Sequence, residues 1–246
     1  MVPLLYKFSA MYDALIITPV KDSIQSALKT IESVSASEGK FEYIVYNDFS
    51  NSETKSSLER NSRIYGYELV NIEDLTINPP PNYRLILQLA QQKALVKEIP
   101  LIIIESDVIV AKNILKELIS ISETYKNSGM VGAITVNEKN EYNFPYAFEK
   151  KKSNEVVITK HSLSFSCTLI TISFLMKFSF ENLSAKKDWF DVYVSRQSKK
   201  YGFVNLLAKN LEVFHQPHSS RPWKKLKYEN PVLYYLEKYL KKRDRI

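Results

Sequence analysis

The chain has 246 residues, of which 45% are apolar and 12% aromatic, enough to bury the core of one large domain or two small ones. This composition excludes a disordered chain. The single cysteine, Cys167, excludes an intrachain disulfide, a cysteine zinc cluster and a C-x-x-C redox pair, and fits a reducing compartment. The five glycines never form G-x-G-x-x-G or G-x-x-x-x-G-K-[ST], so neither glycine-rich phosphate-binding loop is present.

The positive charge is concentrated at the end of the chain. The net charge is +7, and residues 221–246 carry +6 of it, with nine Lys and Arg against three acidic residues. A nucleic-acid surface usually spreads its cations over a groove, so we expect an anionic partner beside this segment and no nucleic-acid binding. The first 20 residues do not resemble a secretory signal, and the longest uncharged run, 161–176, is short for a membrane span. We therefore expect a cytoplasmic protein.

Strand-like and helix-like segments alternate along the first half of the chain. Residues 14–20 are almost wholly apolar, as in a strand buried on both faces, and residues 23–35 place apolar side chains at helical spacing. The same alternation predicts further strands at 41–46, 67–72 and 100–104, and helices at 53–65 and 83–96. It indicates an α/β fold with a mostly parallel central sheet and helices on both faces.

The second half is less regular and contains no repeat or linker. Its pattern predicts helices at 113–125 and 188–201, and strands at 130–136, 156–159 and 165–172, with another around 213–214. Residues 138–154 are polar and charged, which is typical of a surface loop. A single domain over residues 1–220 is the simplest prediction.

Polar residues follow three of the apolar strands. These are residues 18–20 (Thr-Pro-Val), 47–50 (Asn-Asp-Phe-Ser) and 105–107 (Glu-Ser-Asp). In an open parallel sheet, ligands bind at the carboxyl ends of the strands. If the strand continues, alternation puts Glu105 and Asp107 on the same side, well placed to hold Mg²⁺ or Mn²⁺ with a diphosphate. Alternatively, Asp107 caps the following helix and Glu105 is only solvated.

These three motifs, in this order, resemble the GT-A glycosyltransferases, especially glycosyltransferase family 2. In that family the second strand typically ends Asp-Asp-Gly-Ser and the fourth Asp-x-Asp, so residues 47–50 and 105–107 are variants of both. The resemblance spans roughly residues 14–216. It implies a GT-A fold with a nucleotide-binding half at about 14–110, an acceptor half at about 111–220, and a separate C-terminal segment, 221–246.

The resemblance also implies roles for individual residues. Asp48 would read the nucleotide base, and Thr18, Pro19 and Val20 would line the base and ribose pocket. Asp107 would ligate the metal on the donor diphosphate, and Glu105 would touch the ribose or a metal-bound water. Relatives often place a phosphate-contacting Arg where this chain has Arg84, which is alternatively a surface cation.

An acceptor hydroxyl needs a general base, and two aspartates compete for this role. Asp188 and Asp191 are three residues apart at the start of a predicted helix, hence on one face. The family's acceptor motif matches Asp188 by its neighbours and Asp191 by its distance from Gly202. Both remain candidates, and either is also an ordinary helix-capping residue.

Two histidines lie close together after the last predicted strand. Several GT-A enzymes place a metal-binding His at this point, so His215 and His218 are candidate ligands beside the carboxylates. The alternative is a hydrogen-bonded loop histidine.

The pattern of residues 231–245 predicts an amphipathic basic helix. It would rest on an anionic membrane carrying lipid-linked acceptors, or pack its apolar stripe against its own domain or a second copy in a homodimer. Packing is the favoured alternative.

Taken together, the resemblance implies an inverting, Mn²⁺- or Mg²⁺-dependent transferase that moves a sugar from a nucleoside-diphosphate sugar to a hydroxyl of a glycan or lipid-linked acceptor. The expected context is the synthesis of a surface polysaccharide or another glycan. A nucleotidyltransferase on a related sheet, or a non-catalytic carbohydrate- or nucleotide-binding domain, are the alternatives.

Overall fold

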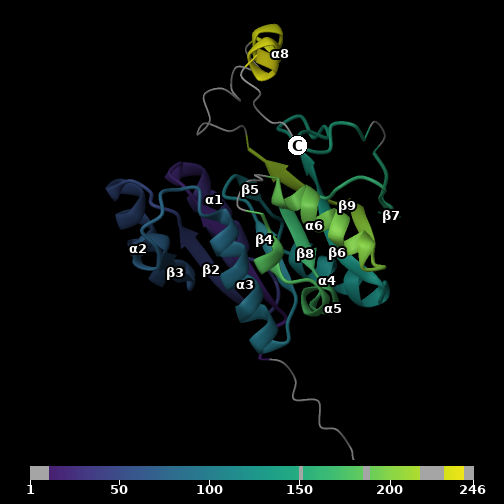
Figure 1. Cartoon of the computed structure of the whole chain (residues 1–246), viewed down its shortest axis with the longest axis horizontal. Helices are drawn as coiled ribbons and strands as arrows, with labels where there is room; N and C mark the ends of the chain where they lie inside the picture. Colours follow the sequence, from purple (N-terminus) through teal and green to yellow (C-terminus); the bar gives the residue numbers. More distant parts are fainter. Residues whose placement is uncertain (1–10, 150–151, 185–188, 217–229, 241–246) are drawn as a thin grey trace, which may run out of the picture.

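A computed structural model describes residues 11–149, 152–184, 189–216 and 230–240, with residues 237–240 described without their side chains. The described residues form a nine-stranded sheet in the order β3-β2-β1-β4-β8-β6-β9-β5, with β7 also paired to β9 (Figure 1). The strands are β1 Ala14–Val20, β2 Phe41–Asn47, β3 Glu68–Asn71, β4 Leu101–Ile104, β5 Val108–Ile109, β6 Ser128–Val136, β7 Val156–Ile158, β8 Cys167–Ile170 and β9 Val204–His215.

Six of these strands run in the same direction, namely β3, β2, β1, β4, β6 and β9. The prediction of a mostly parallel sheet is therefore confirmed, but β8 runs antiparallel between β4 and β6, and β5 and β7 run antiparallel to β9. At the centre, β1 and β4 pair in parallel with Leu15 opposite Leu101. Both residues are fully buried, as expected of apolar strands covered on both faces.

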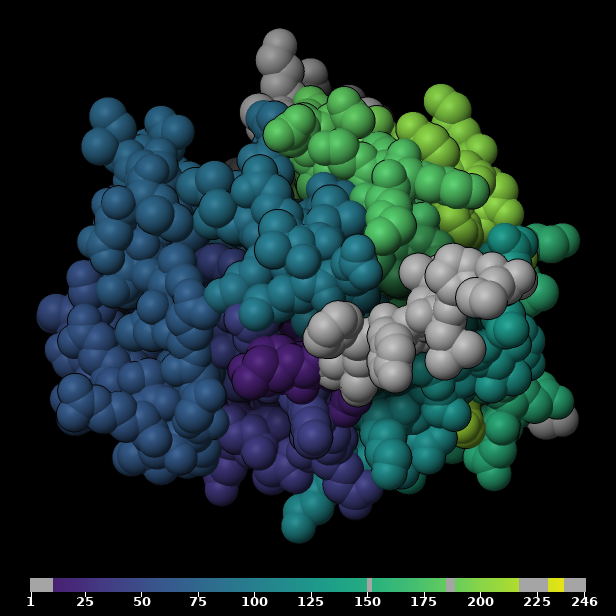
Figure 2. Space-filling view, turned by 90° about the horizontal axis from the view of Figure 1, so that it is seen from below, coloured from purple at the N-terminus to yellow at the C-terminus, as the bar shows by residue number. Residues whose placement is uncertain are grey.

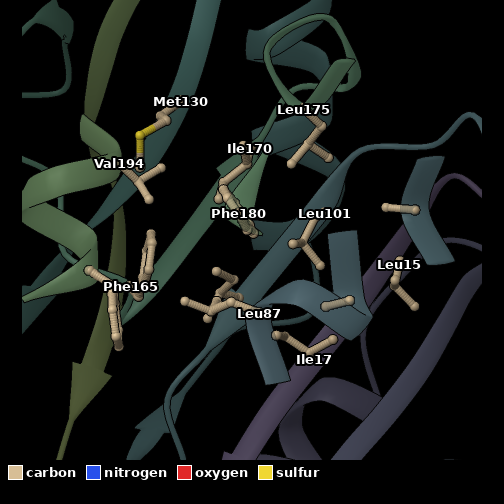
Figure 3. Packing of buried hydrophobic residues seen from close by; sticks show 14 of the residues in the cluster. Leu15, Ile17, Leu87, Leu101, Met130, Phe165, Ile170, Leu175, Phe180 and Val194 are labelled. Carbon is tan, nitrogen blue, oxygen red and sulfur yellow. The ribbon is translucent and has the colours of Figure 1, made fainter. Parts of the chain in front are cut away.

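Helices cover both faces of the sheet, as predicted. On one face, α1 (Ile24–Ser35), α2 (Ser52–Tyr65) and α4 (Ile114–Thr124) bury their apolar stripes against the strands. On the other face lie α3 (Tyr83–Lys97), α5 (Ile172–Lys177) and α6 (Phe190–Lys200). Figure 3 shows the core on this second face, where Leu87 of α3 lies beside Ile17 and Leu101 of the strands. The sheet therefore separates two apolar cores, one on each of its faces.

The helix α3 is tied to the second half of the chain by one buried side chain. The Gln91 amide donates to the carbonyls of Leu175 and Phe178, at 3.0 and 2.6 Å, and accepts from the Phe180 N–H at 2.6 Å. Phe180 opens the 3₁₀ helix η2 (Phe180–Asn182). In Figure 2 the surface of α3 accordingly lies against that of α5 and η2. This contact holds the two halves of the molecule together on the α3 face.

Several elements differ from the sequence prediction. The strand predicted at 67–72 ends at Asn71, and a 3₁₀ helix, η1 (Ile72–Asp74), follows it. The strand predicted at 165–172 is only β8, after which the chain forms α5. Strand β9 has 12 residues, but the sequence indicated only its end. Its pairing with β6 shifts register between Ala133 and Ile134, and this bulge interrupts the alternation that would have predicted the strand.

The last helix, α8, spans Pro231–Leu240. Its side chains Val232, Leu233, Tyr235 and Leu236 are between 40% and 80% exposed. Among the helices of the described residues, α8 included, none has the length and apolar character needed to cross a bilayer.

Candidate active site

A turn after β4 assembles the most distinctive polar cluster. Strand β4 ends at Ile104, and the Val108 N–H donates to the Glu105 carbonyl at 3.1 Å, which closes the turn. The short strand β5 then pairs with the end of β9, so that Val108 lies opposite His215. Glu105, Asp107 and His215 therefore meet, with one ligand atom from each lying within 4.8 Å of the others. We call these three residues the carboxylate–histidine cluster.

This convergence has a different cause from the one the sequence suggested. Alternation along a continuing strand was expected to bring Glu105 and Asp107 together, but β4 stops before Glu105. The turn makes the two carboxylates converge instead. Asp107 begins no helix: it precedes β5, so the alternative of a helix cap is wrong.

The imidazole of His215 is oriented for binding a cation. Its Nδ1 lies 2.7 Å from the Phe144 carbonyl oxygen, and its Nε2 lies 3.5 Å from Asp107 Oδ2. A carbonyl oxygen only accepts hydrogen bonds, so Nδ1 carries a proton. Nε2 donates to Asp107 when the ring is protonated, and in the neutral ring its lone pair points in the same direction. Metal-binding histidines commonly use this second hydrogen bond to fix the ring.

The electrostatics of the cluster favour positive charge. Burial lowers the pKa of His215, but the hydrogen bond and charge of Asp107, the charge of Glu105 and the Phe144 carbonyl together raise that pKa above its ordinary value. The Asp107 and His215 side chains are only 7% and 4% exposed, so water screens these charges little. The same field that stabilises a proton on the imidazole would stabilise a divalent cation.

Glu105 is held by the loop before β8. Its backbone N–H donates to the Ser166 carbonyl at 3.1 Å, and its Oε2 accepts from the Ser166 hydroxyl at 3.4 Å. The cluster thus offers two carboxylates and one imidazole from three separate segments. Oxygen ligands with one nitrogen suit Mn²⁺, and carboxylates suit Mg²⁺, so the residues fit the predicted metals.

The carboxylate of Asp48 is fixed by a residue that the sequence did not single out. Asn82 donates from its backbone N–H to Asp48 Oδ2 and from its side-chain amide to Oδ1, both at 2.8 Å. Asp48 and Asn82 are 6% and 8% exposed. Asn82 immediately precedes α3, so the start of that helix sets the orientation of the carboxylate predicted to read a base.

The loop after Asp48 contains one departure from the pattern of the resembled family, at Phe49. Phe49 stands where the pattern has glycine, and its φ is +54°, the left-handed conformation that glycine adopts without strain. Asp22 and Ser23, in the neighbouring loop, also have positive φ values of 54° and 56°. The two loops are joined by hydrogen bonds from the Asp22 N–H to the Ser50 hydroxyl and from the Asn51 N–H to Asp22 Oδ1, each 2.9 Å long. Non-glycine residues in this conformation cluster at functional sites.

Of residues 18–20, only Pro19 has a partly exposed side chain. Thr18 is fully buried and accepts a hydrogen bond from the Tyr43 hydroxyl at 2.9 Å, and Val20 packs in the core on the α1 face. Pro19 is half-buried. The lining of a base and ribose pocket by these three residues stays a prediction.

The remaining predicted residues lie on the α3 and α6 side. Arg84 donates to the Glu181 carbonyl at 3.2 Å, and its contact with a phosphate stays a prediction. Asp191 is in the first turn of α6, and its charge, like that of Glu105, acts on the hydroxyls of Tyr83 and Tyr146.

Two predicted residues, Asp188 and His218, lie outside the described residues, so the choice between the two aspartates stays open. Cys167 is fully buried, and burial raises the pKa of its thiol to about 12, which agrees with its expected lack of nucleophilic function.

The comparisons with known proteins support the fold. No family model matches the chain, and no curated protein matches it by sequence. Solved structures do match. S. aureus TarS 1–349 in complex with UDP-GlcNAc has a TM-score of 0.63 and 14% identity, and the match covers 85% of this chain and 60% of TarS 1–349. The mannosyltransferase PcManGT from Pyrobaculum calidifontis, with GDP-Man and Mn²⁺, has a TM-score of 0.62 and 13% identity, with coverage of 96% of this chain and 65% of PcManGT. GalNAc-T7 with UDP, GalNAc and Mn²⁺ is also similar, with a TM-score of 0.61, 12% identity, and coverage of 85% and 45%.

These similarities establish that the chain has the GT-A fold found in glycosyltransferases, as its motifs predicted. The chain spans between about half and two thirds of the length of these structures. At identities of 12–14% they define the fold alone.

Proposed function

We propose that the protein is a metal-dependent, inverting glycosyltransferase that uses a nucleoside-diphosphate sugar as donor and a hydroxyl as acceptor. The carboxylate–histidine cluster carries this proposal, because it offers a buried set of cation ligands at the edge where the parallel strands end. The similar structures with bound UDP-GlcNAc, or with GDP-Man and Mn²⁺, support the same type of donor and metal.

In this proposal Asp107 and His215 hold the divalent ion, Mn²⁺ or Mg²⁺, and Glu105 contacts it or the ribose. The ion, when bound, neutralises the negative charge that grows on the diphosphate as the sugar leaves. Asp48, held rigid by Asn82, accepts hydrogen bonds from the base, and Arg84 is assigned to a phosphate. The chain lacks the glycine-rich loops, so these side chains would take over the binding of the nucleotide.

The reaction we propose is a direct displacement. An acceptor hydroxyl oxygen bonds to the anomeric carbon while the bond from that carbon to the diphosphate oxygen breaks, and Asp191 or Asp188 takes the hydroxyl proton. A single displacement inverts the anomeric centre. The base must lie on the side of the sugar opposite the diphosphate; of the two candidates, Asp191 is among the described residues, in the first turn of α6.

The acceptor and the setting of the reaction are inferred from the sequence. We infer a glycan or lipid-linked acceptor in the synthesis of a surface polysaccharide. The 221–246 segment, separate from the catalytic domain of 1–220, would hold the enzyme at the inner membrane face or form a homodimer. The exposed apolar side chains of α8 are compatible with either contact.

Binding measurements test the proposal directly. Calorimetric titration of UDP-GlcNAc, GDP-mannose, UDP and GDP, each with and without Mn²⁺, should identify one base whose binding depends on the metal. Asp107→Asn should abolish this dependence, whereas Glu123→Gln, an exposed carboxylate on α4, should not alter it. Equal nucleotide binding by the wild type and Asp107→Asn would refute the assignment of the cluster.

A further inference from the structure

Tyr83, the first residue of α3, has its aromatic ring between two segments of the second half of the chain. The ring meets that of Phe165 edge-on, with centroids 6.3 Å apart, and lies at a tilt 6.2 Å from the ring of Phe190. Phe165 precedes Ser166, which hydrogen-bonds Glu105, and Phe190 precedes Asp191. The ring of Tyr83 therefore packs on the residue before Ser166, which holds Glu105 of the carboxylate–histidine cluster, and on the residue before Asp191.

The hydroxyl of Tyr83 differs from those of other buried tyrosines. Its oxygen is buried and has no hydrogen-bond partner among the described residues. By contrast, the Tyr67 hydroxyl donates to the Leu58 carbonyl at 2.6 Å, and the Tyr146 hydroxyl accepts from the Ser164 N–H at 3.0 Å. A buried hydroxyl without a partner costs the folded protein free energy, so the hydroxyl of Tyr83 calls for an explanation.

The charges around this hydroxyl indicate what would bind to it. Burial and the negative charges of Glu105 and Asp191 raise the pKa of Tyr83 well above its ordinary value, so the phenol is neutral and can donate a hydrogen bond. The two carboxylates only accept hydrogen bonds when ionised. A phosphate oxygen brought to this point would be repelled by both carboxylates. A sugar hydroxyl fits, because it can accept from the phenol and donate to a carboxylate.

We propose that Tyr83 is a substrate-contacting residue whose hydroxyl donates a hydrogen bond to a hydroxyl group of the transferred sugar. The inference rests on the proposed function, in which that sugar lies between the diphosphate at the cluster and the acceptor at Asp191. The oxygen is covered in the structure, so the contact requires neighbouring side chains to shift around the entering sugar.

The test uses Tyr83→Phe, which removes only the hydroxyl. We expect its thermal midpoint to equal or exceed that of the wild type, because the hydroxyl has no described partner to lose. Binding of UDP and GDP with Mn²⁺ should be unchanged. For the matching nucleotide sugar, UDP-GlcNAc or GDP-mannose, the affinity gained from the sugar and the rate of donor hydrolysis should each fall about tenfold, as for one lost hydrogen bond.

Tyr146→Phe is the matched control. Tyr146 experiences the same two carboxylates, but its hydroxyl already holds the Ser164 N–H, so this variant should lose thermal stability and keep its preference for the sugar. A lowered thermal midpoint in Tyr83→Phe would show a structural role and overturn the proposal. So would an unchanged sugar preference, or an equal loss of nucleotide and nucleotide-sugar binding. A wild-type protein that binds neither these four ligands nor CDP and dTDP sugars would refute the proposed function itself, and this proposal with it.

Discussion

Replacing Asn82 with aspartate should destabilise the protein in a way that depends on pH. The Asn82 amide nitrogen lies 2.8 Å from Asp48 Oδ1, and both residues are at most 8% exposed. In Asn82→Asp, a carboxylate oxygen takes the place of this donor. Two charges centred about 4 Å apart repel by about 4 kcal/mol at an effective dielectric constant of 20.

Protonating one of the two carboxylates does not reduce this loss of stability at neutral pH. Keeping one carboxyl neutral at pH 7, against an ordinary Asp pKa of about 3.9, also costs about 4 kcal/mol. The pair raises the folded-state pKa of one carboxyl above its unfolded value. The folded variant is therefore relatively most stable below about pH 4, and it loses that stability as the pH rises through the raised pKa.

Urea denaturation at pH 4.5 and pH 7.5 measures both effects. We expect Asn82→Asp to lose about 4 kcal/mol of unfolding free energy relative to wild type at pH 7.5, and much less at pH 4.5. Asn82→Ala should lose about 1.5–3 kcal/mol with little pH dependence, because it removes one hydrogen bond to a charged group and adds no charge. If Asn82→Asp matches the wild type at pH 7.5, the contact between Asn82 and Asp48 does not exist as described.

Three further predictions concern other parts of the molecule. Mn²⁺ at about one hundred times its dissociation constant should stabilise the wild type by about 2.7 kcal/mol, read as a higher thermal midpoint, and Asp107→Asn should abolish the shift. Cys167, fully buried and with a pKa of about 12, should resist Ellman's reagent at pH 8 until urea unfolds the chain; rapid native labelling would contradict its burial. A Cβ on Gly129 would lie 2.1 Å from the Ser198 hydroxyl oxygen and 2.8 Å from Phe203 Cβ. Gly129→Ala should therefore lower the free energy of unfolding, measured by urea denaturation, by about 1–3 kcal/mol. A smaller loss would mean that Ser198 and Phe203 move aside easily.

The sequence predicted the first half of the fold well because its signals are local. The apolar runs of β1 and β4 and the apolar spacing in α1 are complete within their own segments. The second half depends on distant pairing. Strand β9 contains a register shift beside charged residues, and β8 is antiparallel to both of its neighbours in the sheet. Neither feature follows from periodicity alone.

The candidate site was predictable in its residue types and less so in its geometry. Glu105 and Asp107 stand out because they follow an apolar strand, and His215 because histidine is scarce. The contact between them depends on the pairing of β5 with β9, which no local pattern encodes. The sequence analysis did not single out Asn82 and Tyr83 for the same reason. The contacts that distinguish them are with residues more than 30 positions away, and their place at the start of a helix is by itself ordinary.

The pairing of β5 with β9 also has a mechanical consequence. Asp107 and His215 come from segments separated by most of the second half of the chain, yet they are joined by a strand of only two residues. An ion bound by both residues would close the long loop between them and strengthen the two-residue pairing of β5 with β9. Removal of that ion should therefore loosen the second half of the chain before the parallel strands β1, β2 and β4.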